Sequence, residues 1–238
     1  MDEMLRTLVK VTLMAYLVGG CAYHGPARTD IDNPAVRKVA WFSYLDGNDI
    51  RNGCVSGSLD RFRLVYNGQY EKQVRSYEIT QASSNPGGAY FVARALGRTN
   101  LVEASLDDVL SPWRWQKSEA NLSGDEFAQF RDFLTQSGWG HGAPQGKILH
   151  SRDFYWVAAG CHDGQFHFDA WVDAQGDFQK VKFQDFLLAR DKTGVPFRKP
   201  FKVLPIDRVE RGQPNEHFAT IFALTVSGEG IGGLVNAF

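Results

Sequence analysis

Five residues between positions 153 and 183 carry side chains suited to ligand recognition: Trp156, His167, Asp169, Trp171 and Lys180. Indole rings stack on the apolar faces of a ligand, while imidazole, carboxylate and ammonium groups form hydrogen bonds with its polar edges. Sugars and peptides present both kinds of surface. The five residues therefore predict a binding site for a glycan or a protein segment, provided that they share one accessible face.

His167 and Asp169 are also the candidates for catalysis, because imidazole and carboxyl groups transfer protons near neutral pH. They would act as acid and base in a hydrolase. The sequence has no G-x-S-x-G motif or similar nucleophile context. No pair of carboxylates can be selected among the 27 acidic residues without geometry. Enzymatic activity is left undecided, and binding is favoured.

The sequence predicts no metal site and no cofactor. His162, His167 and Asp169 could approach one another across a hairpin, but their spacing is not that of a metal site. Residues 228–233 match G-x-G-x-x-G, yet a dinucleotide site needs a following helix and an acidic residue about 20 positions on. Only five residues follow this run. We expect a flexible tail there.

The chain has three cysteines, two of which lie in its body. Cys54 and Cys161 belong to no C-x-x-C motif and have no catalytic signature around them. In an exported protein such a pair is usually oxidised. We predict a disulfide that closes a loop of about 100 residues, for which the chain-entropy model gives ~4.7 kcal/mol as an upper figure. Free thiols are the alternative.

The third cysteine, Cys21, ends a segment with the layout of an export signal. Arg6 and Lys10 flank the apolar run VTLMAYLV. This run is too short to cross a bilayer, which takes roughly 20 residues. The sequence Val18-Gly19-Gly20-Cys21 that follows resembles the lipobox of bacterial lipoproteins. The alternatives are an ordinary secretory signal or a buried N-terminal helix, and Met4 could be the initiating residue.

The resemblance to bacterial lipoproteins covers residues 1–21 and implies a location for the protein. It implies removal of residues 1–20 and acylation of Cys21. Several lipid chains then hold the protein at a membrane, since each buried CH₂ contributes about 0.8 kcal/mol. A residue other than Asp after the cysteine, here Ala22, implies sorting to the outer membrane.

Composition fits a single exported domain behind a tether. An apolar fraction of 43% and a charged fraction of 22% argue against a disordered chain and against a multi-span membrane protein. The net charge of −1 offers no basic excess for nucleic acid. Residues 21–36 are polar with two prolines and predict the tether, and residues 37–238 predict one domain.

The candidate site residues are predicted to lie on a meander of strands. Asp163-Gly164 forms a two-residue turn that pairs Trp156 with Trp171 and Gly160 with His167. The opposite face is uniformly apolar and is predicted to face the core. It consists of Tyr155, Val157, Ala159 and Cys161 with Val172, Ala170, Phe168 and Phe166. The face of the tryptophans is predicted to be accessible, unless a helix covers it.

A third strand is predicted to complete the meander. A loop over residues 173–176 would bring this strand beside the second one, with Val181 opposite Phe168 and Phe183 opposite Phe166. Lys180 would then lie opposite Asp169 on the face of the tryptophans. The third strand thus completes the candidate binding surface.

The other expected elements define the fold class as α+β, an antiparallel sheet with one or two packed helices. Strands over 62–66 and 70–80 are joined through a three-residue loop, 67–69, with Gly68 at positive φ. A further strand covers 89–96. Ser123 and Glu126 form a capping box that begins a helix over 123–136. A short helix precedes Pro112, and residues 218–226 form a strand or a short helix.

These observations predict a lipid-anchored protein on the periplasmic face of the bacterial outer membrane. It would act as a binding or interaction module for an envelope protein or glycan, with the face around Trp156 and Trp171 as its contact surface. The alternative is an envelope hydrolase that acts on peptidoglycan or another polymer. Burial of that face beneath a helix would overturn both site predictions.

Overall fold

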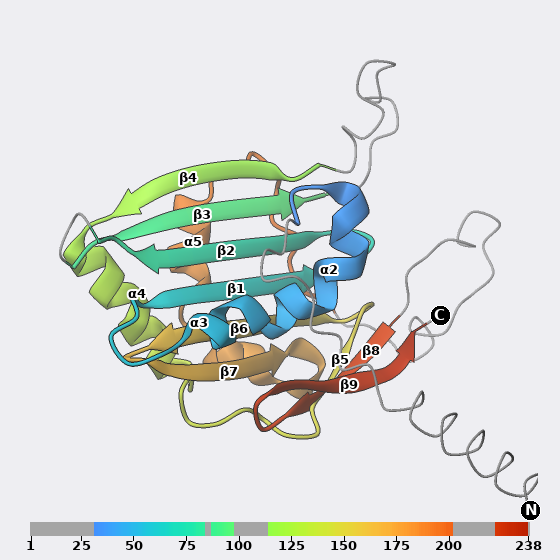
Figure 1. The fold of residues 1–238 in the computed structure, drawn as a ribbon. Coiled ribbons are helices and arrows are strands. Elements are labelled where there is room, and N and C mark those ends of the chain that lie inside the picture. Colours follow the sequence, from blue (N-terminus) through green and yellow to red (C-terminus); the bar gives the residue numbers. More distant parts are fainter. Residues whose placement is uncertain (1–30, 84–86, 98–113, 202–221, 238) are drawn as a thin grey trace, which may run out of the picture.

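The protein is an α+β structure built on a six-stranded antiparallel sheet (Figure 1). The computed structural model describes residues 31–83, 87–97, 114–201 and 222–237. The strand order is β4-β3-β2-β1-β6-β7. The strands of this large sheet are β1 (Arg61–Gly68), β2 (Val74–Gln81), β3 (Ala89–Leu96), β4 (Gln116–Leu122), β6 (Phe154–His162) and β7 (Gln165–Val172). β4 and β7 are therefore the two edge strands.

A second, three-stranded sheet lies beside β6 and β7 (Figure 1). It consists of β5 (Ile148–His150), β8 (Phe222–Ser227) and β9 (Gly230–Ala237). Of the two alternatives for residues 218–226, the strand is confirmed over 222–226, and residues 218–221 lie outside the described residues. The expectation of a flexible tail after residue 227 is wrong, because β9 pairs with β8 along its length.

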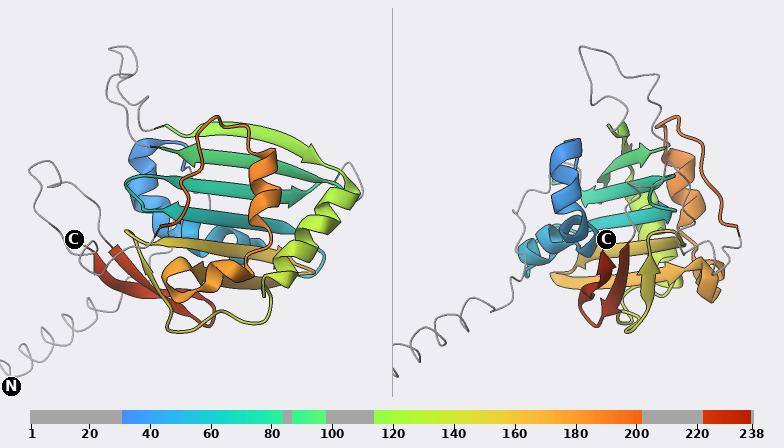
Figure 2. Two further views of the ribbon diagram at one scale, coloured as in Figure 1. Left: turned by 180° about the vertical axis from the view of Figure 1, so that it is seen from behind. Right: turned by 90° about the vertical axis from the view of Figure 1, so that its right-hand side faces the viewer.

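Helices cover both faces of the large sheet (Figure 2). We call the face beneath α2 (Pro34–Asp46) and α3 (Asn48–Gly53) the α2 face. The face beneath α4 (Gly124–Gln136) and α5 (Gln184–Arg190) is the α4 face. α2 begins within the predicted tether, and Ile31 before it is already buried. Pro34 suits the first turn of a helix, where its missing N–H costs nothing. The folded domain therefore begins at or before residue 31, and not at 37.

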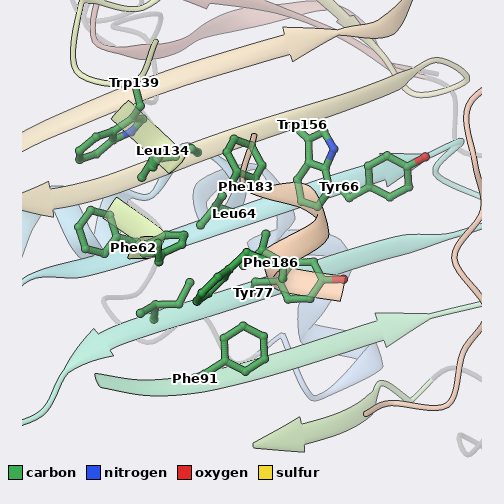
Figure 3. Close-up of a cluster of buried hydrophobic side chains, with 14 of the residues drawn as sticks. Phe62, Leu64, Tyr66, Tyr77, Phe91, Leu134, Trp139, Trp156, Phe183 and Phe186 are labelled. Atoms are coloured by element: carbon green, nitrogen blue, oxygen red, sulfur yellow. The ribbon is translucent and has the colours of Figure 1, made fainter. Parts of the chain in front are cut away.

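The α4 face holds a core rich in aromatic side chains (Figure 3). Phe62, Tyr77 and Phe91 from β1–β3 meet Phe130 and Leu134 of α4 there. The capping box is confirmed: the Ser123 hydroxyl accepts a hydrogen bond from the Glu126 N–H, and the Glu126 carboxylate accepts one from the Ser123 N–H. The buried side chains of α4, Phe127, Phe130 and Leu134, pack on the sheet.

The α2 face holds a second core and a buried ion-pair network. The side chain of Arg63 is 1% exposed and contacts two carboxylates, Asp49 of α3 at 2.6 Å and Glu78 of β2 at 2.7 Å. These contacts satisfy a buried guanidinium and connect α3 to the sheet. Cys54, directly after α3, forms a disulfide with Cys161 of β6, across a Cα–Cα distance of 5.5 Å. The predicted disulfide is confirmed.

The register of the β6–β7 hairpin is confirmed residue by residue. Trp156 lies opposite Trp171, and Gly160 lies opposite His167. The turn residues Asp163 and Gly164 both have positive φ, at 50° and 73°. This conformation suits the twist of a two-residue hairpin.

The predicted register of the first hairpin is wrong. Asn67 pairs with Val74, residues 69–73 connect β1 and β2, and positive φ occurs at Gln69 rather than at Gly68. The Asn67 amide donates hydrogen bonds to the carbonyls of Ser151 and Asp153, at 3.0 and 2.6 Å. The turn is therefore held by a segment more than 80 positions away. A prediction of the register from neighbouring residues alone does not include that segment.

The predicted third strand of the meander is absent from the described residues. Residues 173–175 and 177–180 form two short 3₁₀ helices, and α5 follows. Phe183 lies beneath the tryptophans on the α4 face, with ring centroids 5.3 Å from Trp156 and 5.2 Å from Trp171. It does not lie opposite Phe166. Among the strands that the structure describes, none lies on the outer side of β7.

β4 was not among the expected strands, because its sequence, QKSEANL, lacks apolar alternation. It is a mostly exposed edge strand. The predicted short helix before Pro112 and the proposed signal segment with Cys21 lie outside the described residues.

Candidate functional site

The predicted accessible surface around the tryptophans is wrong. Trp156 is 0% exposed and Trp171 is 3% exposed. The Trp171 indole N–H donates to the carbonyl of Ser137 at 2.8 Å, and the Trp156 indole N–H donates to the side chain of Gln184 at 3.2 Å. Helices cover this face, which was the alternative to an accessible surface. The two tryptophan side chains belong to the core.

The three polar residues of the predicted site do not share one surface either. Asp169 is 8% exposed, and its Oδ1 accepts the Ala170 N–H at 2.7 Å. Lys180 is largely exposed and pairs with Asp177 at 3.2 Å. His167 is half-buried, with its ring edge-on to Trp139 at 5.0 Å. One of the five predicted residues, His167, lines the cleft described below, and the other four do not line that cleft.

The fold shifts the pKa values of two of these groups. Burial lowers the pKa of His167, and the neighbouring His162 adds to this effect. Burial raises the pKa of Asp169 to about 6, although the hydrogen bond from the Ala170 N–H opposes the rise. His167 is therefore neutral at pH 7, and Asp169 takes up a proton in mildly acidic solution.

The outer side of β7 is defined by the pairing of the hairpin. The two-residue turn makes His162 and Gln165 the first hydrogen-bonded pair, and such pairs recur at every second residue. His167, Asp169 and Trp171 therefore direct their N–H and C=O groups toward β6. Four residues direct theirs outward: Phe166, Phe168, Ala170 and Val172. The main-chain N–H and C=O groups of successive β7 residues thus point alternately toward β6 and away from it.

Side chains occupy the outward main-chain groups of the second half of β7. The Ala170 N–H donates to Asp169, and the Ala170 carbonyl accepts from the Lys147 ammonium at 3.1 Å. The Val172 N–H donates to Asp177 at 3.2 Å. Lys147 also bonds to Asp177. These contacts agree with the orientation that the pairing assigns, and they block this stretch of the edge.

The outward groups of Phe166 and Phe168 have no hydrogen-bond partner within the described residues. They face a cavity of about 300 Å³. We call it the β7 cleft; its lining residues are Arg51, Gly142, Ala143, Phe166, His167, Phe168, Gly228 and Glu229. The floor is the β7 edge, one wall is the loop after α4, and the other wall is the β8–β9 turn.

Both walls of the β7 cleft are tied to the rest of the fold. Arg51 donates to the carbonyl of Glu229 at 2.6 Å and pairs with Asp46 at 2.8 Å. Asp46 also accepts the Ile231 N–H at 2.6 Å. On the other side, the Gly146 N–H donates to the carbonyl of Val226 at 2.8 Å. The cleft is thus built from segments held in place by long-range contacts, which favours a preformed site.

A separate cluster of Asp60, His162 and Asp163 has the donor types of a metal site. Asp60 already accepts hydrogen bonds from His162 at 2.7 Å and from the Asp163 N–H at 3.2 Å. The Arg131 guanidinium lies 3.4 Å from the same carboxylate. The Asp60 carboxylate thus has three hydrogen-bond partners, and the cationic Arg131 is one of them, so the cluster is described by a structural ion pair. Of the three possible ligands considered from the sequence, only His162 belongs to this cluster.

Sequence reasoning missed most of the β7 cleft because it placed a third strand over the same edge. It identified Phe166 and Phe168 as core-facing residues but paired their outer side with residues 181–183. Arg51, Gly142 and Glu229 come from three distant segments, and no local pattern marks Arg51 or Gly142. The Gly-rich run at 228–233 was the one local signal, and it marks the β8–β9 turn.

The fold and the site thus define an α+β protein in which a stretch of the β7 edge, open among the described residues, lies inside a cleft. No protein-family model, no curated protein and no solved structure matches the chain. Among the described residues, none of the helices has the length and apolar character needed to cross a bilayer.

Proposed function

We propose that this protein is a lipid-anchored binding module of the bacterial cell envelope, with the β7 cleft as its contact site. Cys21 would carry the lipid at the periplasmic face of the outer membrane, and the domain would bind an envelope protein or glycan. The lipobox-like segment supports the anchor. The Cys54–Cys161 disulfide supports an oxidising compartment, because such bonds persist outside the reducing cytosol.

The observation that carries the proposal is the β7 cleft, whose Phe166 and Phe168 main-chain groups have no partner in the part of the chain that the structure describes. A strand edge is usually blocked by charges, prolines or a covering segment. Here Lys147, Asp169 and Asp177 block one half of the β7 edge, while the half beside the cavity is left open. Polar groups that converge in a preformed cleft are the usual sign of a binding site.

The alternative, an envelope hydrolase, has less support in the geometry. A pKa near 6 would suit Asp169 to proton transfer. However, Asp169 does not line the β7 cleft, and its Oδ1 is engaged by the Ala170 N–H. His167 lines the cleft. Glu229, which is exposed, is the one carboxylate among the residues that line it. Binding is therefore the function that the site supports best.

The anchor is tested by metabolic labelling of the full chain with a fatty-acid analogue in a bacterial host. The proposal expects label on the wild-type protein, recovery in the outer-membrane fraction, and loss of both in Cys21→Ala. A Cys54→Ala, Cys161→Ala double variant, which keeps Cys21, serves as the matched control and should retain the label. Equal labelling of Cys21→Ala would contradict the proposed anchor.

The contact site is tested by photo-crosslinking in intact cells. Glu229, exposed at the mouth of the β7 cleft, is replaced by p-benzoylphenylalanine. Tyr90 on β3, which is 49% exposed, receives the same group as a control. We expect discrete adducts at position 229 alone, and protease or muramidase digestion then identifies the adduct as protein or glycan. The same adducts at both positions, or none at 229, would refute the cleft as contact site.

A further inference from the structure

We propose that the β7 cleft binds an extended polypeptide segment, which adds to the large sheet as a seventh strand at Phe166–Phe168. The inference rests on the proposed function, because it takes the β7 cleft as the contact site. It goes further by naming the class of ligand and the atoms that recognise it. The ligand is recognised mainly by its main chain.

The four outward groups of Phe166 and Phe168 alternate as donor and acceptor with the spacing of a β-strand. An antiparallel partner strand can exchange two hydrogen bonds with each of these residues. A peptide main chain offers the complementary alternation at every second residue. A glycan has no such repeat, so the geometry favours a polypeptide over a sugar polymer.

The blocked half of β7 limits the length of this pairing. Beyond Phe168, the Ala170 and Val172 groups are held by Asp169, Lys147 and Asp177. At the other end, β7 begins at Gln165, directly after the turn. The paired stretch of the ligand therefore spans about three residues, which suits a cavity near the lower end of the roughly 300–1,000 Å³ range of ligand pockets.

The β7 cleft has two formally charged lining residues, Arg51 and the exposed Glu229, and their opposite signs do not call for a ligand of one charge. Arg51, its one basic residue apart from His167, is paired with Asp46 and stacks over the Phe166 ring at 4.4 Å. Burial lowers the pKa of His167, so the imidazole is neutral at pH 7. Recognition through main-chain groups should depend little on salt, unlike recognition of a polyanion.

The test uses the full chain in detergent micelles and 12-residue peptides selected on it from a random display library. Peptides with alternate main-chain amides N-methylated are the probes. Methylating the amides that face β7 should weaken binding about tenfold or more, while methylating the opposite set should change it less than about twofold. Bound peptide should also slow hydrogen exchange at the Phe166 and Phe168 amides.

Two variants at one position provide the matched control on the protein side. Phe166→Ala removes the ring and keeps the outward N–H, whereas Phe166→Pro removes both. Peptide binding should be retained in Phe166→Ala and lost in Phe166→Pro. If Phe166→Pro fails to fold, the N-methylated peptides still decide the question.

Three outcomes would overturn strand addition: no library peptide binds at the cleft, both methylated sets bind alike, or bound peptide leaves exchange at Phe166 and Phe168 unchanged. Adducts at position 229 that muramidase digests, together with any of these, would overturn strand addition but leave the proposed binding function intact. Absence of lipid on Cys21 would contradict the proposed anchor but would not bear on strand addition.

Discussion

Asp169 is a carboxyl group that the fold keeps almost entirely out of water. Burial raises its pKa from 3.8 to about 6, against the opposing effect of the Ala170 N–H. Because the folded-state pKa lies above the unfolded value, folding favours the protonated form. The contribution of Asp169 to stability is therefore full below pH 3.8 and is lost as the pH rises to about 6.

The substitution Asp169→Asn should remove this pH dependence. The amide oxygen can still accept the Ala170 N–H, and no charge is buried. We expect the free energy of unfolding at pH 7.5 to rise by ~1–3 kcal/mol, with a smaller gain at pH 4. Urea unfolding at both pH values measures this, with Asp132→Asn on the exposed side of α4 as control. Equal gains at both pH values would show that Asp169 is not perturbed.

At the scale of the element, β7 is a strand in which the main-chain groups of successive residues form hydrogen bonds on opposite sides of the strand. A proline at position 166 removes an outward N–H and no ladder bond, whereas a proline at 167 removes a bond to β6. We expect His167→Pro to lower the free energy of unfolding by about 3 kcal/mol or to prevent folding. Phe166→Pro should stay within ~1 kcal/mol of Phe166→Ala. Thermal unfolding compares them; the reverse order would contradict the assigned orientation.

The α4 helix depends on its capping box. Ser123→Ala leaves the Glu126 N–H without its side-chain acceptor, and the free energy of unfolding should fall by about 1 kcal/mol. Ser123→Thr keeps the hydroxyl and is the control. Urea midpoints at constant slope give the difference. An alanine variant as stable as the threonine variant would mean that the cap contributes nothing.

The elements that sequence patterns predicted are those fixed by nearby residues. Asp163-Gly164 sets its own turn, and the strand pairing of both β6 and β7 follows from it. The capping box of α4 is equally local. The loop after Asn67 was mispredicted because its partners are Ser151 and Asp153, which only the tertiary fold brings near.

The candidate site was not predicted from the sequence because it, too, depends on contacts that only the tertiary fold creates. A strand edge is a site only if no strand covers it, and that depends on where the following chain goes. Asp177 takes the Val172 N–H, and Phe183 packs beneath Trp156 and Trp171, so the chain turns away to the α4 face. The alternation of apolar and polar residues along the sequence cannot distinguish this path from a third strand.

At the scale of the whole molecule, the large sheet has helices on both faces and offers ligands only its edges. The β4 edge is exposed and carries the Lys117–Glu119 ion pair, a surface typical of an edge protected against pairing. The β7 edge is blocked at Ala170 and Val172 and is open inside the cleft. Of the two edges of the large sheet, the β7 edge is thus the one with open main-chain groups inside a cleft, among the described residues.

The Cys54–Cys161 disulfide links α3 to β6 across a sequence separation of 107. Loss of so long a loop constraint should lower the free energy of unfolding by about 2–5 kcal/mol. The test compares Cys54→Ala, Cys161→Ala with the oxidised wild type in urea, and reduced wild type is the second arm. Identical midpoints for all three would mean that the bond adds no stability.

The central claim, that the β7 edge is open at Phe166 and Phe168, is tested most directly by residue-resolved amide hydrogen exchange on the unliganded full chain. His167 and Asp169, bonded to β6, should exchange slowly. Phe166 and Phe168 should exchange at least about a hundredfold faster, because their N–H groups face the cleft without a partner among the described residues. Protection of Phe166 and Phe168 equal to that of His167 and Asp169 would show that the edge is already occupied, and would contradict the account.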